Sequence, residues 1–390
     1  MASSSPHART ALDTVDRPSW TPIVALSAAM AMLVASEFLP ASVLPALAAD
    51  IGVSEGVAGL AVAATAIAGA ITAPSIAVLL PRTDRRTMLV GLLAAGSVAN
   101  LVVAAAPNFA VLLAGRLLLG VAIAGAWSFA FGAGVHAMGG RERAVSSGVA
   151  FGVSLATVVG VPVAAIVGDQ IGWRAAFGGA AALTAVTAAG VARALPPVPA
   201  HPGAGIGMLR EALRHRRLLA GAGCIVLVAF GNFAAYPYIR IATERIDPGA
   251  TTWLLVAWGV GGVAGTVLAG VVAVRLRLLA ALAPTLLGVS LLVAATASTV
   301  PVLTAAIVLW GLAFNMVPVA TQLWVTRVES ERVESAMSLQ VTAFQVAITA
   351  GSAAGGALLD AYGVRWPFVV GAVAAVAAGL GFALLRIPAR

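Results

Sequence analysis

The sequence predicts an all-α membrane protein with twelve transmembrane helices arranged as two six-helix bundles. Of its 390 residues, 61% are hydrophobic and 10% are charged, whereas soluble globular domains carry about 25% charged residues. Apolar stretches of membrane-spanning length recur twelve times along the chain, and the sequence repeats itself at about half its length. Lipid, not water, is therefore the expected surroundings for most of the protein.

The twelve predicted spans follow from length and hydropathy, because a helix needs roughly 20 mostly apolar residues to cross a bilayer. Segments that meet this requirement are 20–47, 57–80, 88–106, 109–135, 147–168, 175–195, 218–241, 252–274, 278–298, 302–325, 336–359 and 366–386. An even number of spans places both termini on the same side of the membrane.

An internal repeat supports the division into two halves. A shift of 191 residues superposes Gly120 on Gly311, Ser147 on Ser338, Gly160 on Gly351, Asp169 on Asp360, Gly172 on Gly363, Arg174 on Arg365 and Phe177 on Phe368. Because six spans separate the copies, equivalent helices cross the membrane in the same direction, as in a parallel repeat. The predicted organisation is a tail (1–19), a first bundle (20–195), a Pro-rich and basic linker (196–217) and a second bundle (218–390).

The basic residues predict the orientation. All 23 are Arg, and the net charge is +8. Eighteen fall on the side of the termini, four on the opposite side, and only Arg116 lies well inside a span. Short cytoplasmic loops are enriched in positive charge, so we expect a multi-pass protein of the bacterial inner (plasma) membrane with both termini in the cytoplasm. The first 20 residues lack the apolar core of a signal peptide.

The composition also narrows the function classes. The Arg residues are scattered between apolar runs, which argues against a nucleic-acid surface. The single Cys224 allows neither an internal disulfide nor a Cys-based metal site, and the four His residues are dispersed. We therefore expect no cofactor, no metal and no catalytic site. A membrane-embedded enzyme would need clustered catalytic groups, and a receptor or scaffold would need neither a tandem repeat nor charges deep in the membrane.

Several motifs resemble the major facilitator superfamily: Gly172-Trp-Arg-Ala-Ala-Phe177, its counterpart Gly363-Val-Arg-Trp-Pro-Phe368, and Arg116-Leu-Leu-Leu-Gly120. The resemblance covers nearly the whole chain. It implies the major facilitator fold, in which two six-helix bundles flank a central cavity that opens alternately to each side. It also implies a small-molecule substrate.

More detailed similarity lies in Glu37–Pro45, Asn108–Arg116, Tyr238-Ile-Arg240 and Trp310–Pro318. These stretches are similar to the purine ribonucleoside exporters of the drug:proton antiporter branch. Sugar and drug exporters of that branch share parts of the pattern, so a multidrug or sugar efflux permease is the alternative.

Two further motifs depart from the family pattern. Where the family usually has Asp-Arg-x-Gly-Arg-Arg in the loop after the second span, this chain has Pro81-Arg-Thr-Asp-Arg-Arg86. Asp84 could act as the acidic partner of Arg85 and Arg86, or the loop could simply be basic. Gly160-Val-Pro162 resembles the Gly-Pro motif of the exporters, with one extra residue between the pair. It could bend the fifth span for transport, or be a packing kink.

Glu37 and Arg116 are the only acid and base well inside predicted spans. At about 1.5 Å per residue they lie roughly 16 Å and 13 Å below the outer surface, so they could pair. One interpretation is a fixed ion pair that joins two helices. The other is a proton site, with Glu37 as carrier and Arg116 as its charge partner, because charges within the membrane usually mark ion or substrate pathways.

Polar residues align at helical spacing in three other spans: Ser338, Thr342, Gln345, Thr349 and Ser352 in the eleventh, Asn315 and Gln322 in the tenth, and Asn232, Tyr236 and Arg240 in the seventh. They could line a cavity or join helices through hydrogen bonds. With Trp127, Phe233 and Tyr236 available for stacking, a cavity lined this way suits a hydroxylated or heterocyclic solute. The sequence thus predicts a monomeric, proton-coupled exporter whose partners are a small solute, protons and the lipid bilayer.

Overall fold

The computed structural model describes residues 20–80, 82–139, 141–199, 216–329 and 333–385. The predicted tail 1–19, most of the predicted linker and the side chain of Ser338 lie outside the described part. The described elements are helices: α1 (Thr21–Ile51), α2 (Glu55–Ala58), α3 (Leu60–Leu79), α4 (Arg85–Ala104), α5 (Phe109–Ala137), α6 (Glu142–Leu155), η1 (Ala156–Gly160), α7 (Val161–Gln170), α8 (Trp173–Ala194), α10 (Arg216–Ala235), η2 (Tyr236–Tyr238), α11 (Ile239–Glu244), η3 (Pro248–Ala250), α12 (Thr251–Val272), η4 (Ala273–Arg275), α13 (Leu276–Thr296), α14 (Val300–Val328), α15 (Val333–Tyr362) and α16 (Arg365–Leu384).

Eleven helical segments of the described chain are long and apolar enough to cross a membrane. One of them, Pro248–Thr296, has 49 residues and comprises α12 and α13 with the short turn η4 between them. Arg275 in that turn has φ −104° and ψ 60°, which ends the helical geometry. Counted separately, α12 and α13 bring the number of crossing segments to the predicted twelve, and the all-helical fold class is confirmed.

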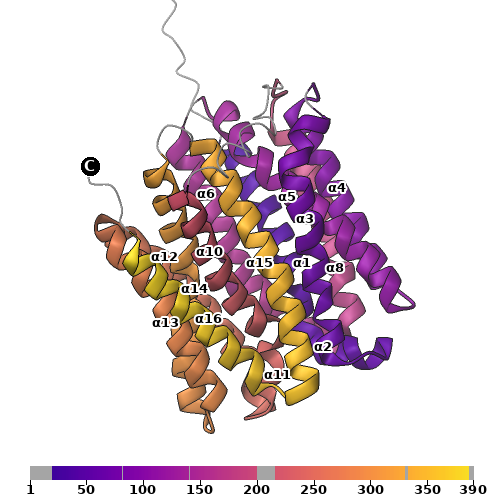
Figure 1. Cartoon of the computed structure of the whole chain (residues 1–390). Coiled ribbons are helices and arrows are strands. Elements are labelled where there is room, and N and C mark those ends of the chain that lie inside the picture. Colours follow the sequence, from indigo (N-terminus) through magenta and orange to yellow (C-terminus); the bar gives the residue numbers. More distant parts are fainter. Residues whose placement is uncertain (1–19, 81, 140, 200–215, 330–332, 386–390) are drawn as a thin grey trace, which may run out of the picture.

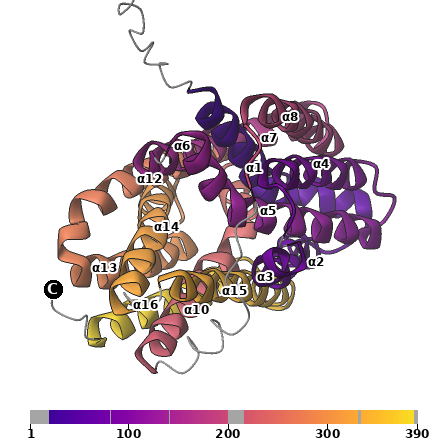
Figure 2. The same ribbon diagram turned by 90° about the horizontal axis from the view of Figure 1, so that it is seen from above.

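The helices form two groups, α1 to α8 and α10 to α16 (Figure 1). Viewed from above, the indigo and purple helices lie on one side and most of the orange and yellow helices on the other (Figure 2). The same helix pairs recur in both groups: α3 packs on α5 as α12 packs on α14, and α4 packs on α8 as α13 packs on α16. These pairs are related by the 191-residue shift.

Glycines at equivalent positions explain why these pairs pack closely. A Cβ on Gly120 of α5 would overlap the carbonyl oxygen of Thr65 in α3. A Cβ on Gly311 of α14 would overlap the carbonyl oxygen of Trp258 in α12 in the same way. Helices in lipid associate largely through close packing of small residues, since no hydrophobic force distinguishes a neighbouring helix from a lipid tail. The repeated glycines therefore set the spacing within each half.

The two halves contact each other at one end of the molecule. The contacts join α1 to α11, α2 and α3 to α15, and η1 and α7 to α12. At this end, where α1 finishes at Ile51 and α15 finishes at Tyr362, the backbones of Gly56 and Gly356 touch. We call it the closed end.

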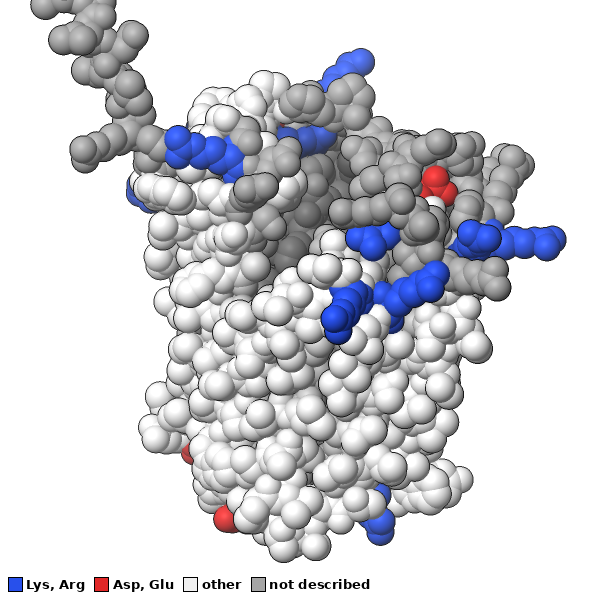
Figure 3. All heavy atoms as spheres, turned by 90° about the vertical axis from the view of Figure 1, so that its left-hand side faces the viewer, with Lys and Arg blue, Asp and Glu red and all other residues white. Residues whose placement is uncertain are grey.

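The opposite end carries the loop at Asp84 and most of the described Arg side chains. In Figure 3 most of the Arg side chains drawn in blue gather at this end. The contacts between the halves described above lie away from this Arg-rich end, which we call the open end.

Candidate functional site

Glu37 lies in the middle of α1 and is only partly shielded from solvent, although its neighbour Ser36 is fully buried. Among the described residues, no hydrogen bond or ion pair to the Glu37 carboxylate is found. The carboxylate interacts electrostatically with Arg116 and with the Tyr236 hydroxyl. The carboxylate therefore lies between Arg116 of its own half and Tyr236 of the other half, without a fixed partner among the described residues.

Arg116 of α5 is fully buried, and its guanidinium donates to backbone carbonyls rather than to a carboxylate. Nη1 donates to the Ser36 oxygen and Nη2 to the Glu37 oxygen, both at 2.7 Å, and Nε donates to the Ala61 oxygen at 2.9 Å. Pro40 explains the first of these bonds. Proline has no N–H, so the helix leaves the carbonyl four residues earlier, that of Ser36, without its usual donor.

The sequence thus brings Glu37 and Arg116 together, but not as the ion pair that we considered. The guanidinium supplies the hydrogen-bond donor that α1 lacks because of Pro40, one turn after Glu37. Such a donor is required where no water can reach the backbone. It meets Glu37 through that residue's main chain, and its charge acts on the carboxylate through space.

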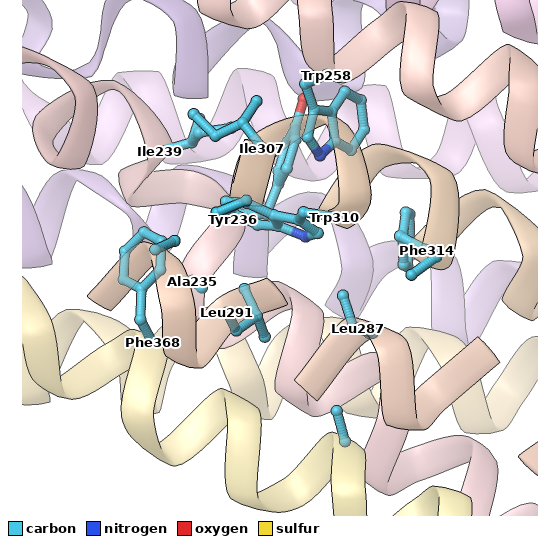
Figure 4. Close-up of a cluster of buried hydrophobic side chains, with 14 of the residues drawn as sticks. Ala235, Tyr236, Ile239, Trp258, Leu287, Leu291, Ile307, Trp310, Phe314 and Phe368 are labelled. Atoms are coloured by element: carbon cyan, nitrogen blue, oxygen red, sulfur yellow. The ribbon is translucent and has the colours of Figure 1, made fainter. Parts of the chain in front are cut away.

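Six aromatic side chains gather beside Glu37 and join the two halves. Phe38 of α1 packs against Tyr236 of η2, with ring centroids 5.1 Å apart, and against Phe233 at 6.3 Å. Tyr236 in turn lies 4.9 Å from Trp258. We call this group the aromatic cluster; its other members are Trp310 and Phe314. Figure 4 shows Tyr236, Trp258, Trp310 and Phe314 gathered there.

Three polar atoms in or beside the aromatic cluster are buried without a hydrogen-bond partner among the described residues. They are the Tyr236 hydroxyl, Trp258 Nε1 and Asn232 Nδ2. The Asn232 oxygen is satisfied, since Trp310 Nε1 donates to it at 2.8 Å. Unpaired buried polar groups are costly and call for an explanation. All three can donate a hydrogen bond, and none of the three atoms is exposed to solvent in this conformation.

The side-chain amides of Asn315 and Gln345 each lie against a glycine of a facing helix. Asn315 of α14 lies against Gly262 of α12 and donates to the Gly311 oxygen of its own helix at 3.0 Å. Gln345 of α15 lies against Gly69 of α3, in the opposite half. Both amides are partly exposed, as is Thr342.

Trp127 and Gln322 are more exposed, and helical spacing relates each to a residue already described. Trp127 is 46% exposed. It follows Arg116 by eleven residues, about three turns at 3.6 residues per turn, and therefore lies on the same face of α5. Gln322 follows Asn315 by seven residues, or about two turns of α14.

Arg240 does not join this group, although its four-residue spacing from Tyr236 suggested a common face. The span is not a continuous α-helix, because the turn η2 around Pro237 changes the residue spacing before α11 begins. Arg240 instead bonds to Asp169 of α7 at 2.5 Å and to Glu244 at 2.6 Å. It lies at the closed end and does not line the space between Glu37 and the amides.

The loop motif after α3 acts through backbone groups. Asp84 accepts hydrogen bonds from the N–H of Thr87 at 2.9 Å, which caps α4, and from the N–H of Val198 at 2.6 Å. Burial disfavours the charge, but these bonds and one from the Arg86 N–H outweigh it and hold the pKa of Asp84 below its ordinary value. Arg85 lies over the Phe129 ring at 4.5 Å, and Arg86 donates to the Ala192 oxygen. The motif fastens the chain after α8 to α4.

Gly160 and Pro162 lie at an irregularity of the fifth span, as their pattern suggested. The π-helical turn η1 ends at Gly160, and α7 begins directly after it. A Cβ on Gly160 would contact Ala35 of α1 at 2.9 Å. A Cβ on Gly259 of α12 would come within 2.7 Å of Val158 in this turn. The irregular turn therefore lies where the two halves meet.

Sequence reasoning missed Trp258, and it did not connect Pro40 with Arg116 or recognise the role of Asp169 and Asp360. The spacing of Pro40 from Ser36 could have revealed the freed carbonyl. The repeat that superposes Asp169 on Asp360 could have revealed that pair. No sequence signal singles out Trp258, whose position depends on how α12 packs against α14.

Comparisons with known proteins agree with this arrangement. The sequence model of the Major Facilitator Superfamily matches residues 24–241 and 218–390. The purine ribonucleoside efflux pump NepI of Salmonella typhimurium (strain LT2) is 34% identical over 364 residues, covering 92% of each chain. NepI of Salmonella enteritidis PT4 is 33% identical over 366 residues, again covering 92% of each.

Among solved structures, a bacterial homologue of the human lysosomal transporter Spinster, in an inward-facing and unoccupied conformation, matches with a TM-score of 0.71. It shares 15% identity, and the match covers 93% of this chain and 96% of that one. This likeness shows the fold. Together with the family match and the curated relatives, it means that the chain belongs to the major facilitator superfamily of membrane transporters and is not an enzyme.

Proposed function

We propose that this protein is a proton-coupled secondary transporter that exports a small heterocyclic solute, of the purine ribonucleoside type, by alternating access. The observation that carries the proposal is the position of the aromatic cluster and its three unpaired donors beside Glu37. The names of the relatives support the same substrate class and the direction of transport.

The chemistry of the cluster fits a purine nucleoside. Purine rings offer flat faces for stacking on aromatic side chains, and their ring nitrogens accept hydrogen bonds. Tyr236, Trp258 and Asn232 supply the donors, while Asn315 and Gln345 can both donate to and accept from ribose hydroxyls.

Glu37 is proposed as the proton carrier and Arg116 as its charge partner. Because no ion pair within the described part of the chain ties the Glu37 carboxylate, a proton can be bound there without first breaking a salt bridge. The Arg116 guanidinium is held by three carbonyls, so it remains in place when the carboxylate changes charge. Phe38 follows Glu37 and packs against Tyr236 of the other half, which supports a direct link between proton binding and solute binding.

We propose the bacterial inner membrane as the location, with both termini in the cytoplasm, because Arg is concentrated at the open end. Single cysteines in a Cys224→Ala background test this. Val274, 89% exposed between α12 and α13, should be shielded in intact cells from an impermeant maleimide that reaches the periplasm. Ile171, 73% exposed after α7, should be labelled. Labelling of position 274 but not of position 171 would show the opposite topology and contradict the proposal.

The Glu37→Gln variant tests proton coupling. Glutamine keeps the size and hydrogen-bonding capacity of a protonated glutamate but cannot titrate. In liposomes, exchange of labelled nucleoside across the membrane should survive, while uphill export driven by a pH gradient should disappear. Glu329→Gln, which removes a carboxylate near the open end, is the matched control and should transport as the wild type does. Proton-driven export by Glu37→Gln at a rate near wild type would return Glu37 to a structural role.

Arg116→Lys tests whether the Arg116 guanidinium stabilises α1 by donating to its backbone carbonyls. An ammonium group cannot reproduce the fork of a guanidinium, and each buried carbonyl left without a donor costs about 1 to 3 kcal/mol. We expect lower thermal stability and slower transport. Pro40→Ala restores an N–H near Ser36, so Arg116→Lys should cost less stability in the Pro40→Ala background than alone. Strictly additive costs in this double-mutant cycle would show that Pro40 and Arg116 act independently.

The substrate site is tested with Tyr236→Phe, Asn315→Ala and Gln345→Ala. Each removes a polar partner of the solute, which costs about 1 to 3 kcal/mol, or roughly five- to 150-fold in affinity. Binding of nucleosides, sugars and cationic drugs to purified protein measures the effect and separates the proposed substrate from the alternatives. Thr304→Ala, which alters a hydroxyl that bonds only within α14, is the control. If nucleoside affinity stays unchanged in all three variants, the residues serve helix packing instead.

A further inference from the structure

Asp169 and Asp360 are equivalent in the 191-residue repeat, and each bonds to the opposite half. Asp169 lies near the end of α7 three residues before Gly172, and Asp360 lies near the end of α15 three residues before Gly363. Both glycines have positive φ, 116° and 88°, so the same tight turn follows each carboxylate. Neither aspartate lies near the aromatic cluster, and the transport mechanism proposed above does not use them.

Asp360 fastens α15 to the first half. Its carboxylate accepts from the Ser54 hydroxyl at 2.5 Å and from the Gly56 N–H at 3.0 Å. Alongside, the Tyr238 hydroxyl donates to the Ser352 carbonyl at 2.9 Å and lies 3.5 Å from that of Gly56. These groups are brought together by the contact between the Gly56 and Gly356 backbones, which no larger side chain would permit.

Asp169 fastens α7 to the second half through a different partner. Its carboxylate accepts from Arg240 of α11 at 2.5 Å. Arg240 also donates to Glu244 of its own helix and to the buried Ser42 carbonyl of α1 at 2.5 Å. That carbonyl adjoins Val43, where the helical geometry of α1 is interrupted. One guanidinium therefore holds two separate elements of the first half.

We infer that Asp169 and Asp360 are paired locks that keep the closed end shut while the cavity is open at the other end. Asp169 lies in α7, which packs on α12, and Asp360 lies in α15, which packs on α3; these two contacts between the halves are equivalent in the repeat. Opening of this end must break both. The Asp169 side chain is 46% exposed, so water can replace its partner and the lock is weak enough to be reversible.

Asp50 offers a matched contrast at the same end of the molecule. It forms an ion pair with Arg174 and accepts from Trp173 Nε1, with the same chemistry and similar exposure. All three residues belong to the first half, so this interaction does not have to break when the halves separate. Loss of a carboxylate should therefore change the conformation at Asp169 and Asp360 but not at Asp50.

Distances between spin labels in the purified full-length protein, in lipid nanodiscs, test the locks without any substrate. Ile171→Cys and Tyr362→Cys in the Cys224→Ala background report on the closed end, because both sites are exposed and lie in opposite halves. Leu79→Cys and Val274→Cys report on the open end. Asp169→Asn and Asp360→Asn should each raise the ratio of open to shut molecules at the closed end roughly three- to tenfold, with matching closure at the other end.

Gly356→Ala gives the same test without a change of charge, because its Cβ would clash with the Gly56 carbonyl of the opposite half only while the closed end is shut. It should shift the distances in the same direction, and Asp50→Asn should leave them as in the wild type. Unchanged distances in both Asn variants, or an equal shift in Asp50→Asn, would overturn the inference. Thermal unfolding of each variant identifies any general loss of folding.

Discussion

The structure depends on one constraint, that backbone polar groups inside the membrane must find partners within the protein. Regular helices meet it by themselves, so a departure from helical geometry needs a donor or acceptor from elsewhere. Arg116 supplies donors where Pro40 interrupts α1, and Arg240 donates to a carbonyl beside the second interruption of the same helix. The two Arg residues thus allow α1 to be irregular at two points shortly after Glu37 and Phe38.

The irregular turns lie beside the residues that we propose to act in transport. Glu37 lies one turn before Pro40, the Tyr236 hydroxyl sits in the turn η2, and the π-helical turn η1 packs against α12 of the other half. A regular helix presents its side chains at a fixed angular spacing, whereas an interrupted one can redirect them and bend. The aromatic cluster, the candidate proton site and the closed end therefore each lie beside an interruption of a helix.

Glycines determine how helices pack within each half and how the two halves contact each other. Within each half, Gly120 and Gly311 allow backbone contact along paired helices, and that packing is extensive. Between the halves, backbone contact is concentrated at points such as Gly56 with Gly356, supplemented by partly exposed polar bonds. A boundary of this kind can part and re-form, while each half moves as a unit.

Hydropathy, Arg distribution and the 191-residue repeat determined the fold class and the twelve spans, because a bilayer requires long apolar helices whatever their tertiary contacts. The sequence also pointed to Glu37 and Arg116, since charge is rare and costly inside spans. Only the tertiary structure showed that Arg116 binds carbonyls, that Arg240 belongs to the closed end and that Trp258 joins the aromatic cluster. Helical spacing predicts faces only while a helix stays regular, and the partners of a buried polar group depend on which neighbouring helix comes close enough to meet it.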